Sequence, residues 1–321
     1  MSNAIATESV GIVGARGYVG AELLALVLAH PRLSLAFATS SSAIGAPIAG
    51  VVPDAPTDLH FENVEPEELA DRAPEVLVLA LANGASEPCV QAAMRAPTPP
   101  RVILDISADH RFEDAWTYGL SEHFESEIRD ARLIANPGCY ATALQLAVRP
   151  LLPFLSAVPN CFGVSGYSGA GAAPSDRNNP DLLHDNIMPY SLVGHTHERE
   201  CARHLGARVR FAPSVAPFFR GIMMTALCEL SEPIGMDALD ALYTNAYADA
   251  PLIDLLGETV PSLHDVINTN RAHIGRLTVD ADDPRKVAVV CAIDNLRKGA
   301  ASQAVQNINL ALGFDTAEGL Q

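Results

Sequence analysis

Four glycines at three-residue intervals near the start of the chain limit its possible folds more than any other pattern. They lie in the run "GIVGARGYVG" and are Gly11, Gly14, Gly17 and Gly20. An apolar stretch, residues 9–14, leads into the run, and residues 18–31 follow it with helical spacing. Glycines between a strand and a helix let the backbone approach a pyrophosphate, which the N–H groups of the helix start favour. The pattern predicts a dinucleotide-binding loop; a glycine-rich turn without a ligand is the alternative.

Alternating strands and helices continue through the first 135 or so residues. Further strand candidates are residues 33–40, 75–82 and 100–107, and residues 85–96 have helical spacing. Apolar strands separated by helices are typical of a parallel sheet that is covered on both faces. The sequence therefore predicts a doubly wound, Rossmann-type α/β domain.

Beyond about residue 139 strands predominate. The strand candidates are residues 161–169, 207–215, 221–230, 274–280 and 286–294. The helical stretches among them are residues 140–152, 198–206 and 236–249. This mixture predicts an α+β domain whose mainly antiparallel sheet forms a wall of the substrate site. The loop at residues 169–186 is long and polar enough to be functional or mobile.

These patterns predict two domains in a chain of 321 residues. The dinucleotide-binding domain is placed at residues 1–138 plus 296–321, because the amphipathic helix near the C-terminus is expected to return to it. Residues 139–295 are expected to form the catalytic, substrate-binding and oligomerisation domain.

The end of the second strand candidate indicates which nucleotide binds. An NAD site usually has Asp or Glu about 20 residues past the glycines, where it binds the ribose 2′-hydroxyl. Here the corresponding residues are Thr39, Ser40, Ser41 and Ser42. Hydroxyls can donate to a 2′-phosphate and Arg16 can pair with it, although a solvated loop arginine is an equal alternative. The missing acid favours NADP.

The net charge of the chain limits the classes of partner that it can bind. Lys and Arg number 21 against 38 Asp and Glu, a formal net charge of −17. This disfavours nucleic acid and anionic membranes, but not an anionic small substrate. No apolar run reaches the roughly 18 residues of a membrane span, and the first nine residues do not resemble a signal peptide. We therefore expect a cytoplasmic protein.

The spacing of the six cysteines argues against two kinds of site. They are Cys89, Cys139, Cys161, Cys201, Cys228 and Cys291. None forms a C-x-x-C pair, and neighbouring cysteines lie more than twenty residues apart. Neither a disulfide framework nor a structural zinc site is expected.

Cys139 differs from the other five in its surroundings. It follows Pro137 and Gly138 and begins a helical stretch, where the helix dipole and N–H groups stabilise a thiolate. The alternative is a buried, inert cysteine, which fits the other five because they lie in apolar patterns. The flanking Asn136 and Thr142 make Cys139 the candidate nucleophile.

Two of the ten histidines are candidates for the acid–base partner that a nucleophilic thiol usually has. His195 and His197 lie in "GHTHERE", near an apparent helix start. The alternatives are solvated histidines in a helix-entry loop, or two metal ligands that lack a third. Spacing alone does not decide among these three interpretations, and we expect no metal site.

Eight stretches, in order along nearly the whole chain, resemble the N-acetyl-gamma-glutamyl-phosphate reductase family, which is related to aspartate-semialdehyde dehydrogenase. They are "GIVGARGYVGAELL", "LDISADHRF", "YGLSE", "LIANPGCYATA", "VSGYSGAG", "GHTHERE", "FAPSVAPFFRGI" and "DNLRKGAASQAVQNIN". The cysteine stretch and the C-terminal stretch are highly specific, whereas the glycine loop is not.

The resemblance implies a role for particular residues. Cys139 would be the nucleophile and His195, in preference to His197, the acid–base, with Glu200 as an orienting carboxylate at the substrate site. Arg111 and Asn136 would lie by the phosphate, and Arg220 near the substrate or its supporting residues. Asn295 would lie near the nicotinamide amide. The other implied cofactor-binding residues are Gly11, Gly14, Ala15, Arg16, Gly17, Tyr18, Thr39, Ser40, Ser41, Ser168 and Gly169.

The resemblance also implies the reaction. It is the NADPH-dependent reduction of N-acetyl-gamma-glutamyl phosphate to N-acetylglutamate 5-semialdehyde and phosphate, through a cysteine thioester, in arginine biosynthesis. A homo-oligomer, dimer or tetramer, is implied as well. Thr196 stands where the family usually has arginine and Ala172–Pro174 where it usually has a basic pair, so the same chemistry on an aspartyl or aminoadipyl phosphate is an alternative. A non-catalytic NADP-binding redox sensor is another.

Overall fold

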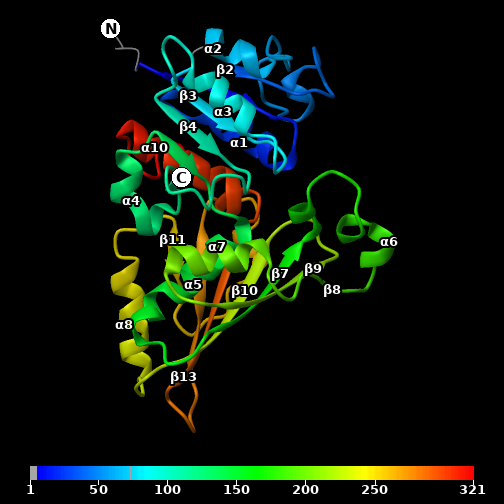
Figure 1. Cartoon of the computed structure of the whole chain (residues 1–321). Helices are drawn as coiled ribbons and strands as arrows, with labels where there is room; N and C mark the ends of the chain where they lie inside the picture. The colour runs from blue at the N-terminus through cyan, green and yellow to red at the C-terminus, as the bar shows by residue number, and fades with distance from the viewer. Residues whose placement is uncertain (1–5, 73) are drawn as a thin grey trace. The chain divides into compact units, whose positions relative to one another are not determined.

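The computed structural model describes residues 6–72 and 74–321, which form two compact units (Figure 1). The first unit lies within Met1–Pro137 and Ala300–Gln321, and the second spans Gly138–Gly299. In the described part of the chain, no helix combines the length and the apolar character needed to cross a membrane. The functional roles of the two units stay predictions.

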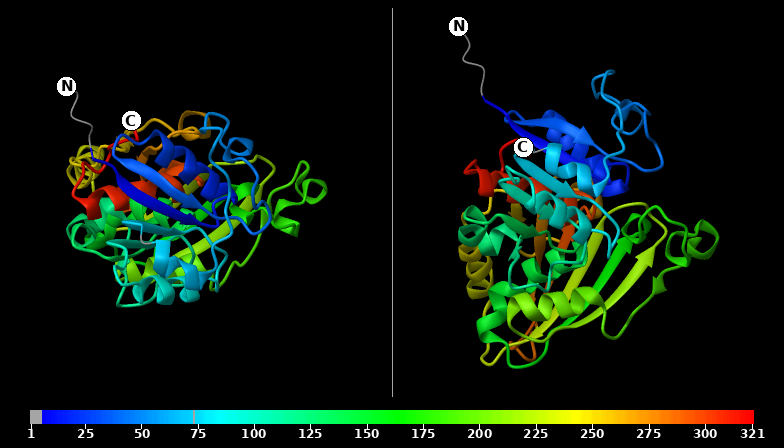
Figure 2. Two further views of the ribbon diagram at one scale, coloured as in Figure 1. Left: turned by 90° about the horizontal axis from the view of Figure 1, so that it is seen from above. Right: turned by 45° about the horizontal axis from the view of Figure 1, so that its top comes forward.

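The first unit contains a six-stranded sheet in the order β2-β1-β3-β4-β6-β5. In the two views of Figure 2, the strands nearest the N-terminus are the blue arrows of this sheet. All its neighbouring strands run parallel. The strands are β1 (Glu8–Val13), β2 (Leu33–Ala38), β3 (Val76–Leu79), β4 (Val102–Asp105), β5 (Thr117–Tyr118) and β6 (Leu133–Ala135). The predicted parallel, doubly wound sheet is confirmed, and β5 and β6 extend it beyond the four strands that the sequence indicates.

Helices cover both faces of this sheet. They are α1 (Tyr18–Ala29), α2 (Leu69–Arg72), α3 (Glu87–Met94), α4 (Ser121–Arg129) and α10 (Ser302–Leu312), with the short turns η1 (Ile48–Gly50) and η2 (Pro66–Glu68). The connection through α1 runs from β1 to β2, and the one through α3 runs the opposite way in the strand order. Right-handed crossovers therefore place α1 and α3 on opposite faces. From the C-terminal end of the chain, α10 packs against α1, α4 and β4.

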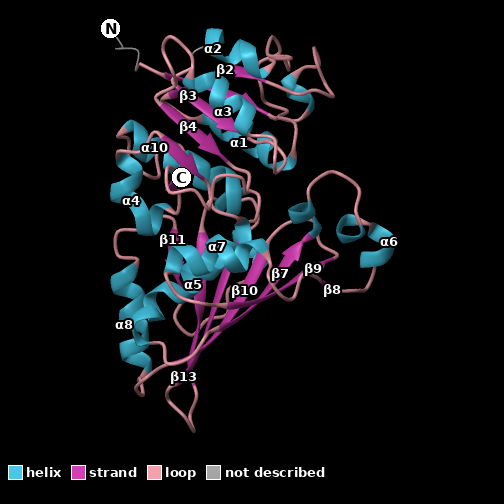
Figure 3. Cartoon of the chain, in the orientation of Figure 1, coloured by secondary structure: helices cyan, strands magenta, loops and turns pink. Residues whose placement is uncertain are grey.

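The second unit contains a seven-stranded mixed sheet in the order β11-β12-β13-β10-β7-β9-β8 (Figure 3). The strands are β7 (Asn160–Gly166), β8 (Met188–Pro189), β9 (Arg210–Ala216), β10 (Ile222–Glu229), β11 (Ile253–Leu255), β12 (Ala272–Val279) and β13 (Lys286–Ile293). Only the pairs β7–β9 and β11–β12 are parallel; the other four are antiparallel. The sheet is thus mainly antiparallel, as predicted.

Helix α5 is buried between this sheet and other helices. The helical segments of the unit are α5 (Cys139–Val148), η3 (Arg149–Phe154), η4 (Tyr167–Ala170), η5 (Asp176–Asn178), α6 (Pro180–Leu183), α7 (Thr196–Leu205), α8 (Met236–Ala246) and α9 (Leu263–Val266). The segment η6 (Arg297–Ala301) begins in this unit, and its last two residues belong to the first. Every residue of α5 after Cys139 is buried, and the helix packs on β10, β13 and α7. Tyr243 and Tyr247 donate hydrogen bonds to the carbonyls of Ala147 and Leu146, at 2.5 and 2.6 Å. These phenols pair carbonyls that the end of a helix leaves without partners.

Candidate active site

Cys139 is the first residue of α5, and Gly138 is the N-cap. A glycine N-cap has no side chain to accept from the first-turn N–H groups, so the positive end of the helix dipole acts on the cysteine sulfur. Gly299 leaves space for the cysteine, since a Cβ there would lie 2.8 Å from the Cys139 Cβ. The local structure favours a thiolate at this position.

The other cysteines are buried, whereas Cys139 is half-exposed, as the sequence predicts. Burial raises the pKa of the Cys89, Cys161 and Cys201 thiols, and it raises the pKa of Cys228 to about 12. These four thiols therefore stay protonated near neutral pH, and a protonated thiol is a poor nucleophile.

His195 is the N-cap of α7, where its side chain has a defined hydrogen bond. Its Nδ1 accepts from the backbone N–H of His197 at 3.1 Å. A neutral ring in this position carries its proton on Nε2. Burial lowers the pKa of His195, and the positive charge of Arg177 lowers it further, against the opposing effect of Glu200 and Glu198. Near neutral pH, His195 therefore presents Nε2–H as a donor.

Aromatic contacts join the cysteine helix to the histidines. The ring of Tyr140, the residue after Cys139, lies with its centroid 6.4 Å from that of His195 and 5.9 Å from that of His197. The two histidine rings are 4.9 Å apart. Tyr190 lies 5.6 Å from His195. In the second unit, both candidate acid–base residues thus pack against the helix residue that follows the candidate nucleophile. Their cluster includes two tyrosines for which the sequence predicts no role.

Glu200 supports the turn in front of the nucleophile. Its carboxylate is fully buried, and Oε1 accepts from the backbone N–H of Gly138 at 2.8 Å. Charge-assisted hydrogen bonds of this kind are roughly twice as strong as neutral ones. The contact places Glu200 behind the turn that carries Cys139, and its expected role in orienting a histidine or the substrate stays a prediction.

Three predicted cofactor residues are neighbours in the second unit. Asn295 is buried; its Nδ2 donates to the Ser168 Oγ at 2.9 Å, and its Oδ1 accepts from the backbone N–H of Gly221 at 2.7 Å. A Cβ on Gly169 would lie 3.8 Å from the Asn295 Nδ2 and 3.0 Å from the Ser165 Oγ. The close packing accounts for a glycine here and leaves the predicted cofactor contacts as proposals.

Arg220 forms an ion pair with a fully buried carboxylate. Its Nε lies 2.7 Å from Oδ2 of Asp294. The same carboxylate accepts from the backbone N–H groups of Asn268 and Leu296, at 2.7 and 2.9 Å. Removing one partner of such a pair would leave a buried charge uncompensated. The geometry favours the supporting role among the two that the resemblance implies for Arg220.

The glycine loop of the first unit lies open at the start of α1. Gly14 has φ of +83°, and a Cβ there would lie 2.5 Å from the carbonyl oxygen of Ala80. Its N–H donates to the Thr39 Oγ1 at 3.1 Å. Gly17 is an N-cap without a side-chain cap, and a Cβ there would meet nothing closer than 3.9 Å. By contrast, a Cβ on Gly11 would overlap the Phe37 ring, so Gly11 serves packing between β1 and β2.

The predicted 2′-phosphate residues lie together at the end of β2. The Arg16 Nη1 donates to the Ser42 Oγ at 3.1 Å, and the Ser40 Oγ lies 3.5 Å from the same atom. Arg16 and Ser41 are exposed, and Ser40 is buried. The first unit thus presents one guanidinium and several hydroxyls on one small surface beside the glycine loop. Ala15 is buried, and the partly exposed Tyr18 begins α1.

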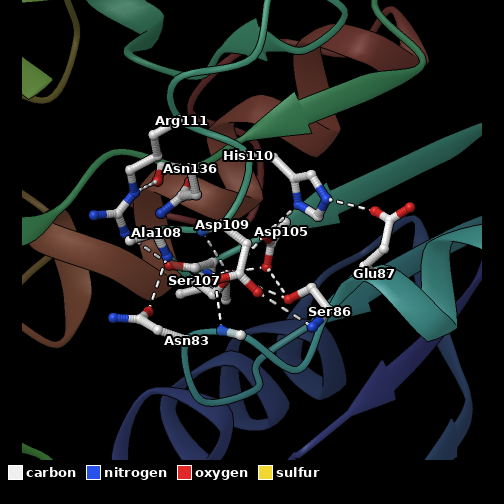
Figure 4. Close-up of polar contacts among 12 residues, drawn as sticks. Asn83, Ser86, Glu87, Asp105, Ser107, Ala108, Asp109, His110, Arg111 and Asn136 are labelled. Atoms are coloured by element: carbon white, nitrogen blue, oxygen red, sulfur yellow. Dashed lines mark hydrogen bonds and ion pairs between the residues drawn. The ribbon is translucent and has the colours of Figure 1, made fainter.

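The loop after β4 carries Arg111, and a buried polar cluster fixes it (Figure 4). The Arg111 Nε donates to the carbonyl of Asn136, and Nη2 donates to that of Ile106, both at 2.8 Å. The fully buried Asp105 carboxylate lies 2.7 Å from the His110 Nδ1. The first unit therefore brings Arg111 and Asn136 together. No role is predicted from the sequence for Asp105 or His110, although both lie in "LDISADHRF".

His110 is held between two carboxylates. Burial opposes its protonation, but hydrogen bonds to Asp105 and Glu87 prevail and raise the pKa of His110. Trp116 stacks on the imidazole, with the ring centroids 4.0 Å apart. Ser86 and Ser107 donate to the Asp105 carboxylate at 2.9 and 2.7 Å. Such a satisfied network makes the segment that carries Arg111 rigid.

Comparison with known proteins decides the family. Residues 9–131 match the model of the semialdehyde dehydrogenase NAD binding domain, and residues 139–295 match that of the semialdehyde dehydrogenase dimerisation domain. N-acetyl-gamma-glutamyl-phosphate reductase of Xanthomonas axonopodis pv. citri is 48% identical over 308 residues, which are 96% of each chain. The enzyme of the same name from Stenotrophomonas maltophilia is 48% identical over 309 residues, 96% of each. The chain belongs to the N-acetyl-gamma-glutamyl-phosphate reductase family. As a member of this family, it is an oxidoreductase that acts on aldehyde groups.

Solved structures support the same fold at low sequence identity. Aspartate semialdehyde dehydrogenase II of Vibrio cholerae, complexed with ASA, has a TM-score of 0.76 at 19% identity over 96% of this chain and 98% of that one. Aspartate semialdehyde dehydrogenase of Francisella tularensis has a TM-score of 0.76 at 15% identity over 95% and 99%. These likenesses confirm the α/β fold of this chain.

Proposed function

We propose that the protein reduces N-acetyl-gamma-glutamyl phosphate with NADPH, through a thioester on Cys139, in arginine biosynthesis in the cytoplasm. The observation that carries the proposal is the position of Cys139, the half-exposed cysteine at the start of α5. The histidine cluster packs on the next residue of that helix. The names of the relatives support the substrate.

The first unit has the features that a dinucleotide with a 2′-phosphate requires. The start of α1 is uncapped and Gly17 leaves its backbone open, which suits a pyrophosphate. Arg16 in the glycine loop and Ser42 in the segment after β2 offer donors to a 2′-phosphate. Asn295 with Ser168 and Gly169 would contact the nicotinamide side. When bound, NADPH supplies the hydride that reduces the thioester carbon.

The residues of the chain account for the other steps. The Cys139 thiolate attacks the acyl carbon; a C–S bond forms as the C–O bond to phosphate breaks, and Arg111 and Asn136 receive the departing phosphate. First-turn N–H groups of α5 stabilise the oxyanions that form on the acyl carbon. We assign two tasks to the Nε2 of His195. It donates to the oxyanion, and it transfers the proton that the sulfur takes up when the aldehyde leaves.

One assay separates this function from its alternatives. NADP reduction is followed at fixed phosphate with N-acetylglutamate 5-semialdehyde and, separately, with aspartate semialdehyde. Phosphate-dependent reduction that favours the acetylated substrate is expected. A preference for aspartate semialdehyde would indicate that the enzyme performs the same chemistry on aspartyl phosphate. If no semialdehyde supports phosphate-dependent reduction of NADP, the non-catalytic redox sensor is the remaining interpretation.

Replacing Arg16 with alanine should weaken NADPH binding by roughly 1–3 kcal/mol, because a charge-assisted bond to the 2′-phosphate is lost. NADH has no 2′-phosphate, so its affinity should change little, and the wild type should prefer NADPH. Fluorescence titration of both cofactors measures this. Arg95→Ala, at the end of α3, is the control because it removes the same charge elsewhere in the first unit. Equal affinities of the wild type for the two cofactors would contradict the assignment.

We also propose that the second unit forms a homodimer through the face of its sheet opposite α5. Phe162 on β7 and Leu227 on β10 are 49% and 44% exposed there, on adjacent antiparallel strands. Exposed apolar side chains that share one face are typical of an interface. The dimerisation-domain match supports this proposal.

Leu227→Asp should therefore shift the protein from dimer to monomer, since a carboxylate would be buried without a partner. Sedimentation velocity at several protein concentrations measures the change. Val260→Asp, at a position that is 58% exposed outside the strands, is the matched control. An unchanged dimer in Leu227→Asp would exclude this face.

A further inference from the structure

Arg177 lies in η5, in the long loop between η4 and α7, and its neighbour fixes the backbone around it. The Asn178 Oδ1 accepts from the backbone N–H of Ser175 at 2.7 Å. The Asn178 Nδ2 donates to the carbonyls of Gly171 and Ala173, at 2.9 and 2.8 Å. Three hydrogen bonds from one side chain therefore hold the turn that carries Arg177.

The Arg177 guanidinium lies over an aromatic ring of the histidine cluster. Its Cζ is 4.9 Å from the centroid of Tyr190, and the Tyr190 ring is 5.6 Å from that of His195. Contact with a ring covers the flat face of a guanidinium and leaves its N–H edge available for planar hydrogen bonds. Arg177 is thereby joined, through one ring, to the candidate acid–base residue.

Arg177 has no neutralising carboxylate in the described part of the chain. It is half-buried and forms no ion pair there, in contrast to Arg220, which pairs with Asp294. Its charge acts on the cluster: after burial, it is the next cause of the lowered pKa of His195. Part of the guanidinium interacts with the Tyr190 phenol. Its remaining N–H groups, held in a preorganised position, suit a planar anion such as a carboxylate.

We propose that Arg177 binds the free carboxylate of the acyl substrate and so selects acyl groups that carry one. The inference rests on the proposed function, because it names the contact for one end of that substrate. The phosphate leaves when the thioester forms, but the carboxylate stays on the acyl chain until the aldehyde is released. A cation in the same unit as Cys139 therefore holds the acyl chain throughout, whereas Arg111 and Asn136 serve only the phosphate.

The test compares two aldehydes that differ by this carboxylate. N-acetylglutamate 5-semialdehyde carries it, and 4-acetamidobutanal is the same molecule without it. Arg177→Gln should raise the KM for the first by roughly 10- to 100-fold, the loss of a charge-assisted pair, and change kcat far less. The KM values for 4-acetamidobutanal, phosphate and NADP should stay as in the wild type. Arg177→Lys should recover part of the loss.

Arg208→Gln is the matched control, because Arg208 is an exposed arginine of the same unit. This substitution should leave the KM values for both aldehydes unchanged. An unchanged KM for the semialdehyde in Arg177→Gln would overturn the proposal. An equal loss with both aldehydes would do so as well, since it would mark a general effect on the cluster.

A second measurement does not depend on turnover. N-acetylglutamate should protect Cys139 from iodoacetamide better than 4-acetamidobutyrate does in the wild type, and Arg177→Gln should remove this advantage. Equal protection by N-acetylglutamate in both proteins overturns the role of Arg177. If the wild type fails to turn over N-acetylglutamate 5-semialdehyde, the proposed function is wrong, and the protection experiment still decides the role of Arg177.

Discussion

Cys139→Ser should lower turnover by roughly 10⁴-fold or more, the size of effect seen when a covalent nucleophile is removed. A hydroxyl gains little from the helix dipole at the start of α5 and is almost entirely protonated near neutral pH. NADPH binding should persist, because the glycine loop belongs to the first unit. Steady-state turnover and fluorescence titration of NADPH measure the two properties on the same sample.

Alkylation of the wild type gives an independent readout of the same thiol. Brief iodoacetamide treatment and peptide mapping should place the label first on Cys139, because the other five cysteines are buried. Cys228→Ser is the control, because it removes a thiol from β10. Its turnover and the labelling of its Cys139 should equal those of the wild type. Full activity in Cys139→Ser, or first labelling elsewhere, would falsify the covalent mechanism.

Replacing His195 with asparagine should lower kcat by roughly 10²- to 10⁴-fold, the usual contribution of a positioned acid–base group. Asparagine is chosen because it is among the best N-cap residues and its Oδ1 can accept from the N–H of His197 in place of Nδ1. The start of α7 should therefore stay folded while the imidazole is lost. Pre-steady-state kinetics should show that acylation of Cys139 is less affected than turnover.

His197→Asn is the comparison for this prediction, because His197 contacts the same Tyr140 ring but does not cap the helix. Its effect should be smaller. The reverse order would transfer the acid–base role to His197 and leave the family chemistry in place. If both variants keep wild-type kcat, neither histidine moves the proton.

Local patterns were sufficient to predict the architecture. Each of the strands β1 to β4 has at least four residues and contains an apolar run, so each could be recognised alone. Strands β5 and β6 have two and three residues, too few for any periodicity, and they form because β4 offers an edge to pair with. Cys139 could be recognised because the start of a helix is a local feature.

Other site residues could not be found in this way. Arg177 and Tyr190 meet His195 across a loop, and no spacing in the sequence records that contact. Asp105 and His110 look like ordinary residues of a strand end, and only the folded first unit shows that they lie 2.7 Å apart in a closed network. Glu200 reaches the N–H of Gly138 from a different helix.

Because α5 is buried, substrate binding does not have to fix the position of the helix that carries the nucleophile. Each residue of α5 after Cys139 is buried, and the phenols of Tyr243 and Tyr247 hold two of its last carbonyls. The conformational entropy of the segment that carries the sulfur is therefore lost once, when the chain folds, and not again in each catalytic cycle. Binding energy from the acyl chain is then available for aligning the carbonyl carbon with a sulfur whose direction is already set.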